Sequence, residues 1–169
     1  MKTTLTATLS KNSFKNLIDE LNTYKSQLQK GIDNGVKQIT LQVYELVLNK
    51  CNEANIKNHI GNIKWTYDEE TNIGKVYTNE LVIIVNEMGT GIRGKNNSHP
   101  NPSENFASWT YDVNEHGELG WKYPKEDGTF GWTKGLPSKH MFYDAFLEAK
   151  DLIPSTIEIE ISKTTGNLY

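Results

Sequence analysis

Cysteine is nearly absent from this chain of 169 residues, because Cys51 is the only one. A single thiol excludes an intrachain disulfide framework and a cysteine-based zinc site. Long apolar runs are missing too: the longest, Leu81 to Val85, is much shorter than the ~20 residues that cross a bilayer. The N-terminal stretch lacks the apolar segment of a secretory signal. We therefore expect a protein of the cytoplasm, or of an assembly made there.

An excess of positive charge is also missing. The chain has 18 basic and 21 acidic residues and a formal net charge of −3. A dedicated nucleic-acid-binding protein usually presents a basic face, so this balance argues against that class. The length fits one domain with its own core. We place that domain at residues 1–169, with an extended arm at 1–10 and a loose tail at 163–169.

Hydrophobic periodicity predicts an α+β fold, in which N-terminal helices pack on a small antiparallel sheet and a C-terminal helix follows. Apolar residues over 14–28 recur at steps of three and four, and the same spacing continues over 32–54. The glycines between these helices leave a break, a bend or one continuous helix open. Alternating patterns predict hairpins at 63–77 and at 121–132, the second with Asp-Gly at its turn.

The remaining segments give less decisive patterns. Five apolar residues at 81–85 fit a buried strand or a helical turn equally well. Prolines and small polar residues predict a loop over 94–105. Pro137 suits the first turn of the C-terminal helix, and Pro154 suits its end or a kink. The isoleucines over 157–161 alternate with glutamates like a strand, although a helix there stays open.

The helix predicted over 32–54 carries two apolar stripes, whose centres lie roughly 140° apart. Burial on two sides is expected, because a surface helix of a monomer usually shows one apolar face. The helix is then either central in its own domain or shared between its own sheet and a neighbouring subunit. In the second case Leu41, Tyr44 and Leu48 are candidate interface residues. The first stripe contains Ile32, Val36, Ile39, Val43 and Leu46, and the second contains Leu41, Tyr44, Leu48 and Cys51.

The stretch from Gly89 to Lys95 has the spacing G-x-x-x-x-G-K of a phosphate-binding loop. Asn96 stands where such a loop needs a hydroxyl for magnesium, and the prolines that follow disfavour the required helix. We therefore interpret Gly89, Gly91 and Gly94 as a structural turn, in which Gly89 and Gly91 permit a positive φ. A small nucleotide-binding enzyme is the less favoured alternative.

The four histidines do not form a metal or catalytic motif by their spacing. His59, His99, His116 and His140 fall in different predicted elements, and none are four residues apart on one helix. Ser108, Asp112 and His116 lack the glycine frame of a nucleophile elbow. Surface or hydrogen-bonding histidines are the better interpretation, and we predict no catalytic, cofactor-binding or metal-binding residue.

Aromatic residues are concentrated between residues 109 and 132. Such a set fits cross-strand pairs in a small sheet, a protein interface, or a surface that stacks on sugars. The candidate interface residues here are Trp109, Trp121, Tyr123 and Trp132.

The motifs between residues 87 and 146 also resemble, in order and spacing, a known family. Glu87-Met88-Gly89-Thr90-Gly91 is similar to the E-F-G-T-G signature of the small tail-component, or neck, proteins of long-tailed bacteriophages. Met88 replaces the usual aromatic residue, and His140 stands where the family often has proline. The matching motifs that follow are His99-Pro100, Tyr111 to Gly117, Gly120-Trp121 with Tyr123, Gly131-Trp132-Thr133 with Gly135, and Pro137-Ser138 before Met141-Phe142-Tyr143.

The resemblance implies a structural protein without enzymatic activity or cofactor. Members act at the head–tail junction, between head-closure and tail-terminator proteins, and are expected to assemble as homo-oligomeric rings. The implied location is the neck or tail end of a virion or of a tail-like particle, with no membrane contact. Double-stranded DNA would only pass through the ring, which a mildly acidic subunit suits. The alternative is a carbohydrate- or protein-binding module that uses its aromatic hairpin.

Overall fold

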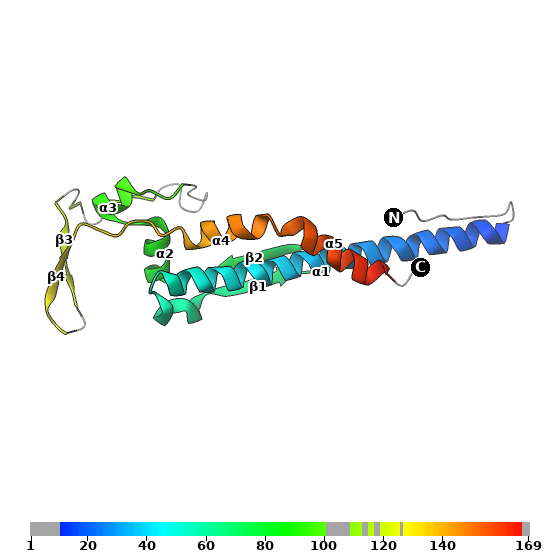
Figure 1. The fold of residues 1–169 in the computed structure, drawn as a ribbon, viewed down its shortest axis with the longest axis horizontal. Helices are drawn as coiled ribbons and strands as arrows, with labels where there is room; N and C mark the ends of the chain where they lie inside the picture. Colours follow the sequence, from blue (N-terminus) through cyan, green and yellow to red (C-terminus); the bar gives the residue numbers. More distant parts are fainter. Residues whose placement is uncertain (1–10, 101–108, 113–114, 117–118, 126, 167–169) are drawn as a thin grey trace.

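The protein is an elongated α+β molecule built along one long helix (Figure 1). This computed structural model describes residues 11–100, 109–112, 115–116, 119–125 and 127–166. The predicted arm over residues 1–10 lies outside this range. The elements in chain order are α1 (Lys11–Glu53), η1 (Lys57–Asn62), β1 (Lys64–Asp68), β2 (Ile73–Tyr77), α2 (Leu81–Met88), α3 (Gly91–Asn96), β3 (Trp121–Pro124), β4 (Phe130–Thr133), α4 (Met141–Lys150) and α5 (Ile153–Thr165).

The two predicted N-terminal helices are one continuous helix, α1. Two interior glycines normally weaken a helix by about 1 kcal/mol each. Here they let α5 approach closely: a Cβ on Gly31 would lie 2.7 Å from the Cα of Ile161, and one on Gly35 would lie 3.1 Å from the Cα of Ile157. The packing of α5 on this glycine face offsets the poor helix propensity.

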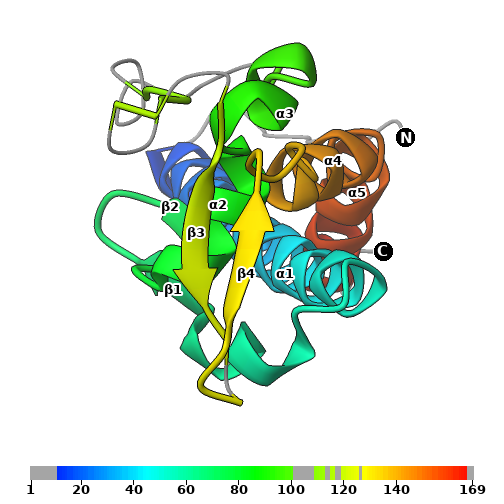
Figure 2. The same ribbon diagram turned by 90° about the vertical axis from the view of Figure 1, so that its left-hand side faces the viewer.

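Both predicted hairpins are present, but they form two separate two-stranded antiparallel sheets. In the first, Trp65 pairs with Val76, and the sheet packs on α1, where Thr40 fills the space above Gly74. In the second, Lys122 pairs with Trp132, and the hairpin projects at the end of the molecule opposite the start of α1 (Figure 1), which is the end that faces the viewer in Figure 2. The expected single small sheet is thus divided into one hairpin that packs on α1 and one hairpin that projects from the molecule.

The core lies where the C-terminal half of α1 meets α2, α4 and the first hairpin. Its fully buried members include Val47, Cys51, Ile83 and Met141. Val43 and Leu46 of the first stripe pack against it, and so do Tyr44 and Leu48 of the second. The assignment of the second stripe to a neighbouring subunit is therefore wrong for Cys51, and Tyr44 and Leu48 also contact the chain's own core. The physical reason is that α1 is central and has elements on several sides.

One segment left open between strand and helix is now assigned, and two other expectations are corrected. The segment 157–161 is helical, because Ile157 and Ile161 share the face that packs on the glycines of α1. The C-terminal helix begins at Met141 instead of Pro137. Residues 163–165, expected in a loose tail, complete α5, and 167–169 lie outside the described residues.

The apolar run at 81–85, which was left open between strand and helix, is helical, and so is the start of the segment 94–105, which was predicted as a loop. The apolar run at 81–85 opens the helix α2, which buries Ile83. The loop predicted at 94–105 starts later, because α3 continues to Asn96. None of the described helices is long and apolar enough to cross a membrane.

Candidate functional site

The glycine turn joins α2 to α3 and is tied on two sides to distant segments. Thr90 exchanges two backbone hydrogen bonds with Leu136, at 2.8 Å and 3.0 Å, and the N–H of Gly91 donates to the carbonyl of Tyr111 at 2.6 Å. Gly89 and Gly91 have φ values of +79° and +59°. These are left-handed values that strain a residue with a Cβ. The turn is therefore a junction at which three separate stretches of backbone meet.

Space as well as φ requires glycine in this junction. A Cβ on Gly89 would lie 2.7 Å from the backbone nitrogen of Ser138, and one on Gly94 would lie 2.6 Å from the carbonyl carbon of Gly89. A Cβ on Gly135 would fall on the carbonyl oxygen of Thr90. The backbones are thus in direct contact, and the room that a phosphate would need between Gly89 and Gly94 is filled by the chain itself.

The position of Lys95 also differs from that in a phosphate-binding loop. In such a loop the helix starts at the lysine and directs its amides at the phosphates. Here α3 starts at Gly91, ends at Asn96 and leaves Lys95 exposed. The geometry fits a structural turn.

Glu87, in the last turn of α2, caps the N-terminus of α4. Its carboxylate oxygens accept hydrogen bonds from the backbone N–H groups of Phe142 and Tyr143, at 2.9 Å and 3.1 Å. The residue before α4, His140, has a left-handed φ of +51° and makes no side-chain cap of its own. Negative charge at a helix N-terminus is stabilising because the unpaired N–H groups and the helix dipole favour it. Glu87 therefore supplies from another helix the cap that α4 lacks locally.

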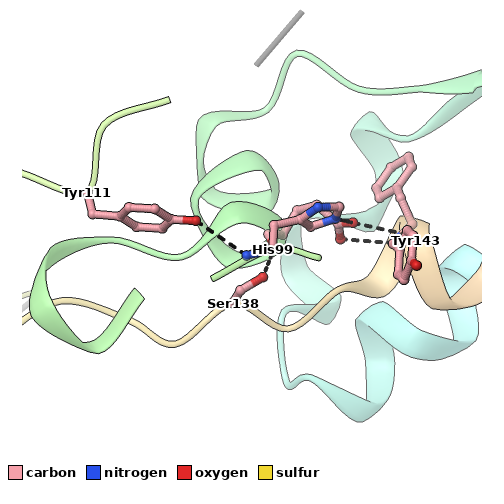
Figure 3. Close-up of polar contacts among 6 residues, drawn as sticks. His99, Tyr111, Ser138 and Tyr143 are labelled. Atoms are coloured by element: carbon pink, nitrogen blue, oxygen red, sulfur yellow. Dashed lines mark hydrogen bonds and ion pairs between the residues drawn. The ribbon is translucent and has the colours of Figure 1, made fainter. Parts of the chain in front are cut away.

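The same carboxylate binds the ring of His99. Nε2 of His99 lies 3.0 Å from Oε1 of Glu87, and the two side chains are only 6% and 12% exposed. The His99 ring meets the rings of His140 and Tyr143 edge-on, with centroid distances of 5.5 Å and 5.3 Å. The backbone N–H of His99 donates to the hydroxyl of Tyr111 at 3.3 Å. This arrangement fixes the loop after α3 against α4 (Figure 3).

Residues just before α4 complete this set of contacts. The hydroxyl of Ser138 donates to the backbone carbonyl of Glu87, and the side-chain amide of Asn97 donates to the carbonyl of Ser138 at 3.0 Å. Lys139 donates its backbone N–H to the carbonyl of Asn86 at 2.8 Å. We use the name Glu87 cluster for the residues that these bonds join, four of which are labelled in Figure 3: Glu87, His99, Tyr111, Ser138, Phe142 and Tyr143.

A buried carboxylate beside an imidazole is a pair that enzymes also use for proton transfer. In this cluster, however, both carboxylate oxygens already accept backbone N–H groups, and the pair is largely covered. Within the described part of the chain, no three histidine, cysteine or acidic side chains lie close enough to hold a metal ion. The chemistry that the cluster supports best is the joining of α2, α3 and α4.

The other histidines lie away from the cluster, except His140. His59 lies 3.4 Å from Glu80 at the surface, and His116 is exposed, as is Asp112. Ser108 lies outside the described residues, so the sequence triad has no described nucleophile.

The candidate interface aromatics are distributed between the junction and the hairpin. Trp109 is half-buried and donates its Nε1–H to the carbonyl of Gly89 at 3.0 Å, which makes it part of the junction. Trp121 is half-buried near Gly91. Tyr123 and Trp132 are exposed, Trp132 by 59%, together with Phe130 at 70%. Among the four candidate aromatics, the two on the hairpin, Tyr123 and Trp132, are thus the ones left exposed.

On α1 the candidate interface residues are less accessible. Leu41, Tyr44 and Leu48 are all half-buried. The sequence analysis missed Asn97 and Lys139, whose contacts with Ser138 and with Asn86 join segments far apart in the chain and leave no local pattern. Glu87 was visible only as the first letter of a motif, because its partners are some 55 positions further along the chain. In comparisons with known proteins, no protein family, curated protein or solved structure matches this chain.

Proposed function

We propose that this protein is a structural component of a bacteriophage or of a phage tail-like particle. Its place is the neck or tail-completion position, where it forms part of the head–tail connection as a homo-oligomeric ring. Head-closure and tail-terminator proteins are its partners, and double-stranded DNA passes through the channel without specific binding.

One observation carries the proposal: the residues that bear the resemblance to neck proteins meet at one structural junction. Glu87, Gly89 and Gly91 come from the signature itself, and Tyr111 and Ser138 come from motifs further along the chain. Gly91 donates its N–H to the carbonyl of Tyr111, and Ser138 donates its hydroxyl to the carbonyl of Glu87. The backbone of Gly89 lies directly against that of Ser138. Motif residues that maintain a fold, instead of facing a pocket, are what a structural protein requires.

The surface chemistry supports the same proposal. A net charge of −3 suits a subunit that lines a DNA channel, because such a surface neutralises few phosphates and therefore binds DNA weakly. The exposed aromatic residues of the β3–β4 hairpin suit contact with a partner, since tryptophan and tyrosine are enriched at interfaces.

The proposal is tested by locating the protein in a particle. Antibodies raised against the purified chain should decorate one end of phage or tail-like particles from an induced culture of the source organism, in electron micrographs. Antibodies against a major tail protein, decorating the whole tail, are the control for access. Antibody labelling that is absent from every particle, while the protein is abundant in the same lysate, would exclude this function.

A second candidate function is favoured by the exposed face of the hairpin. Phe130 and Trp132 lie two residues apart on one strand, so both project from the same face. Such a pair suits stacking on sugar rings as well as contact with protein. Glycan binding by the isolated chain that is lost in Trp132→Ala would favour a carbohydrate-binding module over a neck protein.

A further inference from the structure

The N-terminal half of α1 carries an apolar stripe that is exposed among the residues that the structure describes. Phe14, Ile18, Leu21 and Tyr24 are exposed by 48%, 57%, 46% and 38%. They recur at steps of four, three and three, so they lie on one side of the helix. In Figure 1 this part of α1 continues beyond the end of α5. We call these four residues the α1 stripe.

The stripe continues a packed helix–helix interface of the same chain. Further along α1, Gly31 and Gly35 contact α5, and the side chain of Gln42 lies 3.5 Å from that of Thr156. With Phe14 at the first position of a heptad, Leu21, Leu28, Gly35 and Gln42 take the same position in successive heptads. Because a seven-residue repeat drifts by only about 20° per heptad on a straight helix, the face that receives α5 overlaps the side that bears the α1 stripe. Since α5 ends at Thr165, just past the contact of Thr164 with Gly31, the stripe begins where the partner helix stops.

Charge placement indicates what covers the stripe. In the same heptad register Glu20 takes a g position and Lys25 the following e position. In a parallel bundle of identical helices, a g residue faces the e residue five positions later on the neighbouring helix, so Glu20 meets Lys25 of the next copy. In an antiparallel pair, g faces g and e faces e, and the opposite charges are not brought together. The charges therefore match a second copy in parallel orientation.

We propose that the α1 stripe is a self-association surface, through which copies of this chain pack α1 against α1 in parallel. Subunits related by cyclic symmetry point the same way along the axis, so parallel packing is compatible with a closed assembly. The inference goes beyond the proposed function, because a bundle closed on its apolar stripes has no central channel for DNA. The contact itself is a property of the purified chain.

The test is the mass of the purified chain by light scattering and sedimentation equilibrium, over a wide range of concentration. The monomer has a mass of 19.2 kDa, and the wild-type chain should form a larger species as the concentration rises. Leu21→Glu should weaken this association at least about tenfold, because it places a charge within the apolar contact. Ser26→Glu adds the same charge at an exposed position of the same helix outside the stripe, and should associate like the wild type.

A charge exchange tests the orientation. Glu20→Lys alone and Lys25→Glu alone should each weaken association, and the double variant should recover most of it. Loss in both single variants without recovery would overturn the parallel arrangement. Circular dichroism of each variant monitors folding, which should persist because the stripe is exposed in the monomer.

Other outcomes separate this inference from the proposed function. A chain that stays monomeric at every concentration overturns the inference, and so does an oligomer that Leu21→Glu leaves intact. If a chain lacking residues 1–10 associates while the full chain does not, the arm is the occupant of the stripe and the inference also fails. An intact ring in Leu21→Glu leaves the neck proposal standing. Association that depends on the stripe, in a protein found in no particle, leaves only the inference standing.

Discussion

Removal of the Glu87 carboxylate tests whether the cluster holds the fold together. Glu87→Ala deletes the acceptor for two N–H groups of α4 and for the ring of His99. Loss of a helix cap costs about 0.5–2 kcal/mol, and a buried donor without its partner costs about 1–3 kcal/mol. Phe142 and Tyr143 are half-buried, so water that enters after the substitution would replace part of the lost contact, and we expect a total loss of about 2–4 kcal/mol. Glu87→Gln keeps the shape but offers one acceptor oxygen in place of two, so it should lose about 1–2 kcal/mol.

Urea unfolding monitored by tryptophan fluorescence measures these losses. The midpoint should fall in the order wild type, Glu87→Gln, Glu87→Ala, with an unchanged dependence of the unfolding free energy on urea. The matched control is Glu158→Ala, which removes an exposed glutamate from α5. Exposed substitutions of this kind usually change stability by no more than about 0.5 kcal/mol. If Glu87→Ala also stays within that range, the contacts of Glu87 do not stabilise the fold, and the structural account of the cluster is refuted.

Four other variants and measurements test the remaining parts of the structure. Gly135→Ala should unfold the protein or lower its urea midpoint strongly, because the new Cβ meets the carbonyl oxygen of Thr90. Lys95→Ala on α3 is the control and should leave the midpoint nearly unchanged, because Lys95 is exposed. Equal effects of the two substitutions would contradict the backbone junction. Leu48→Asp should destabilise the isolated monomer by about 2 kcal/mol or more in urea, since Leu48 packs on the core, and a fully stable monomer that only fails to assemble would return Leu48 to the interface. Burial, and then the charge of Glu87, raise the pKa of the Cys51 thiol to about 11 from an ordinary value of 9.0. A thiol reagent at pH 8 should therefore label Cys51 only after unfolding, and the stability that Cys51 contributes should be complete below pH 9 and decline as the pH rises towards 11, a decline that Cys51→Ala should lack. Hydrogen bonds from the side chain and backbone of Thr71, and then from the backbone of Glu70, hold the pKa of Asp68 below its ordinary value of 3.8. Asp68→Ala should therefore lower the melting temperature at neutral pH, and this difference should disappear as the pH falls below 3.8. The same difference at neutral pH and at low pH would show that the charge of Asp68 does not stabilise the turn.

The sequence predicted correctly the elements whose hydrophobic pattern is set by residues close together in the chain. The alternation around Trp65 and the Asp-Gly turn after Lys125 located both hairpins, because each pattern has the period of a strand. The alternation of Ile157, Ile159 and Ile161 was misleading. In a helix the first and third of these share a face and the second points away, and Ile159 is indeed 53% exposed. A two-residue alternation of only three members therefore fits a helix as well as a strand.

The junction was less predictable, because its contacts join segments far apart in the chain. Positive φ at Gly89 and Gly91 was expected from residue type, but the contact of Gly94 with Gly89 and of Gly135 with Thr90 depends on how α2, α3 and the 134–136 segment pack. The start of α4 was misplaced for the same reason. Ser138 and Lys139 are held in extended contact with α2, so Pro137 cannot begin the helix.

The packing of α5 on Gly31 and Gly35 has a consequence for the order in which the molecule is completed during synthesis. The face of α1 that receives α5 leaves the ribosome early, and its partner is the last described helix to emerge. At about 5–20 residues per second, that face waits for many seconds without its cover. A nascent or truncated chain that lacks α5 therefore exposes glycine-rich, apolar helix surface along most of α1. Such chains should be the ones that chaperones bind and proteases remove. A complete chain can escape them only after α5 has been synthesised and has covered this face of α1.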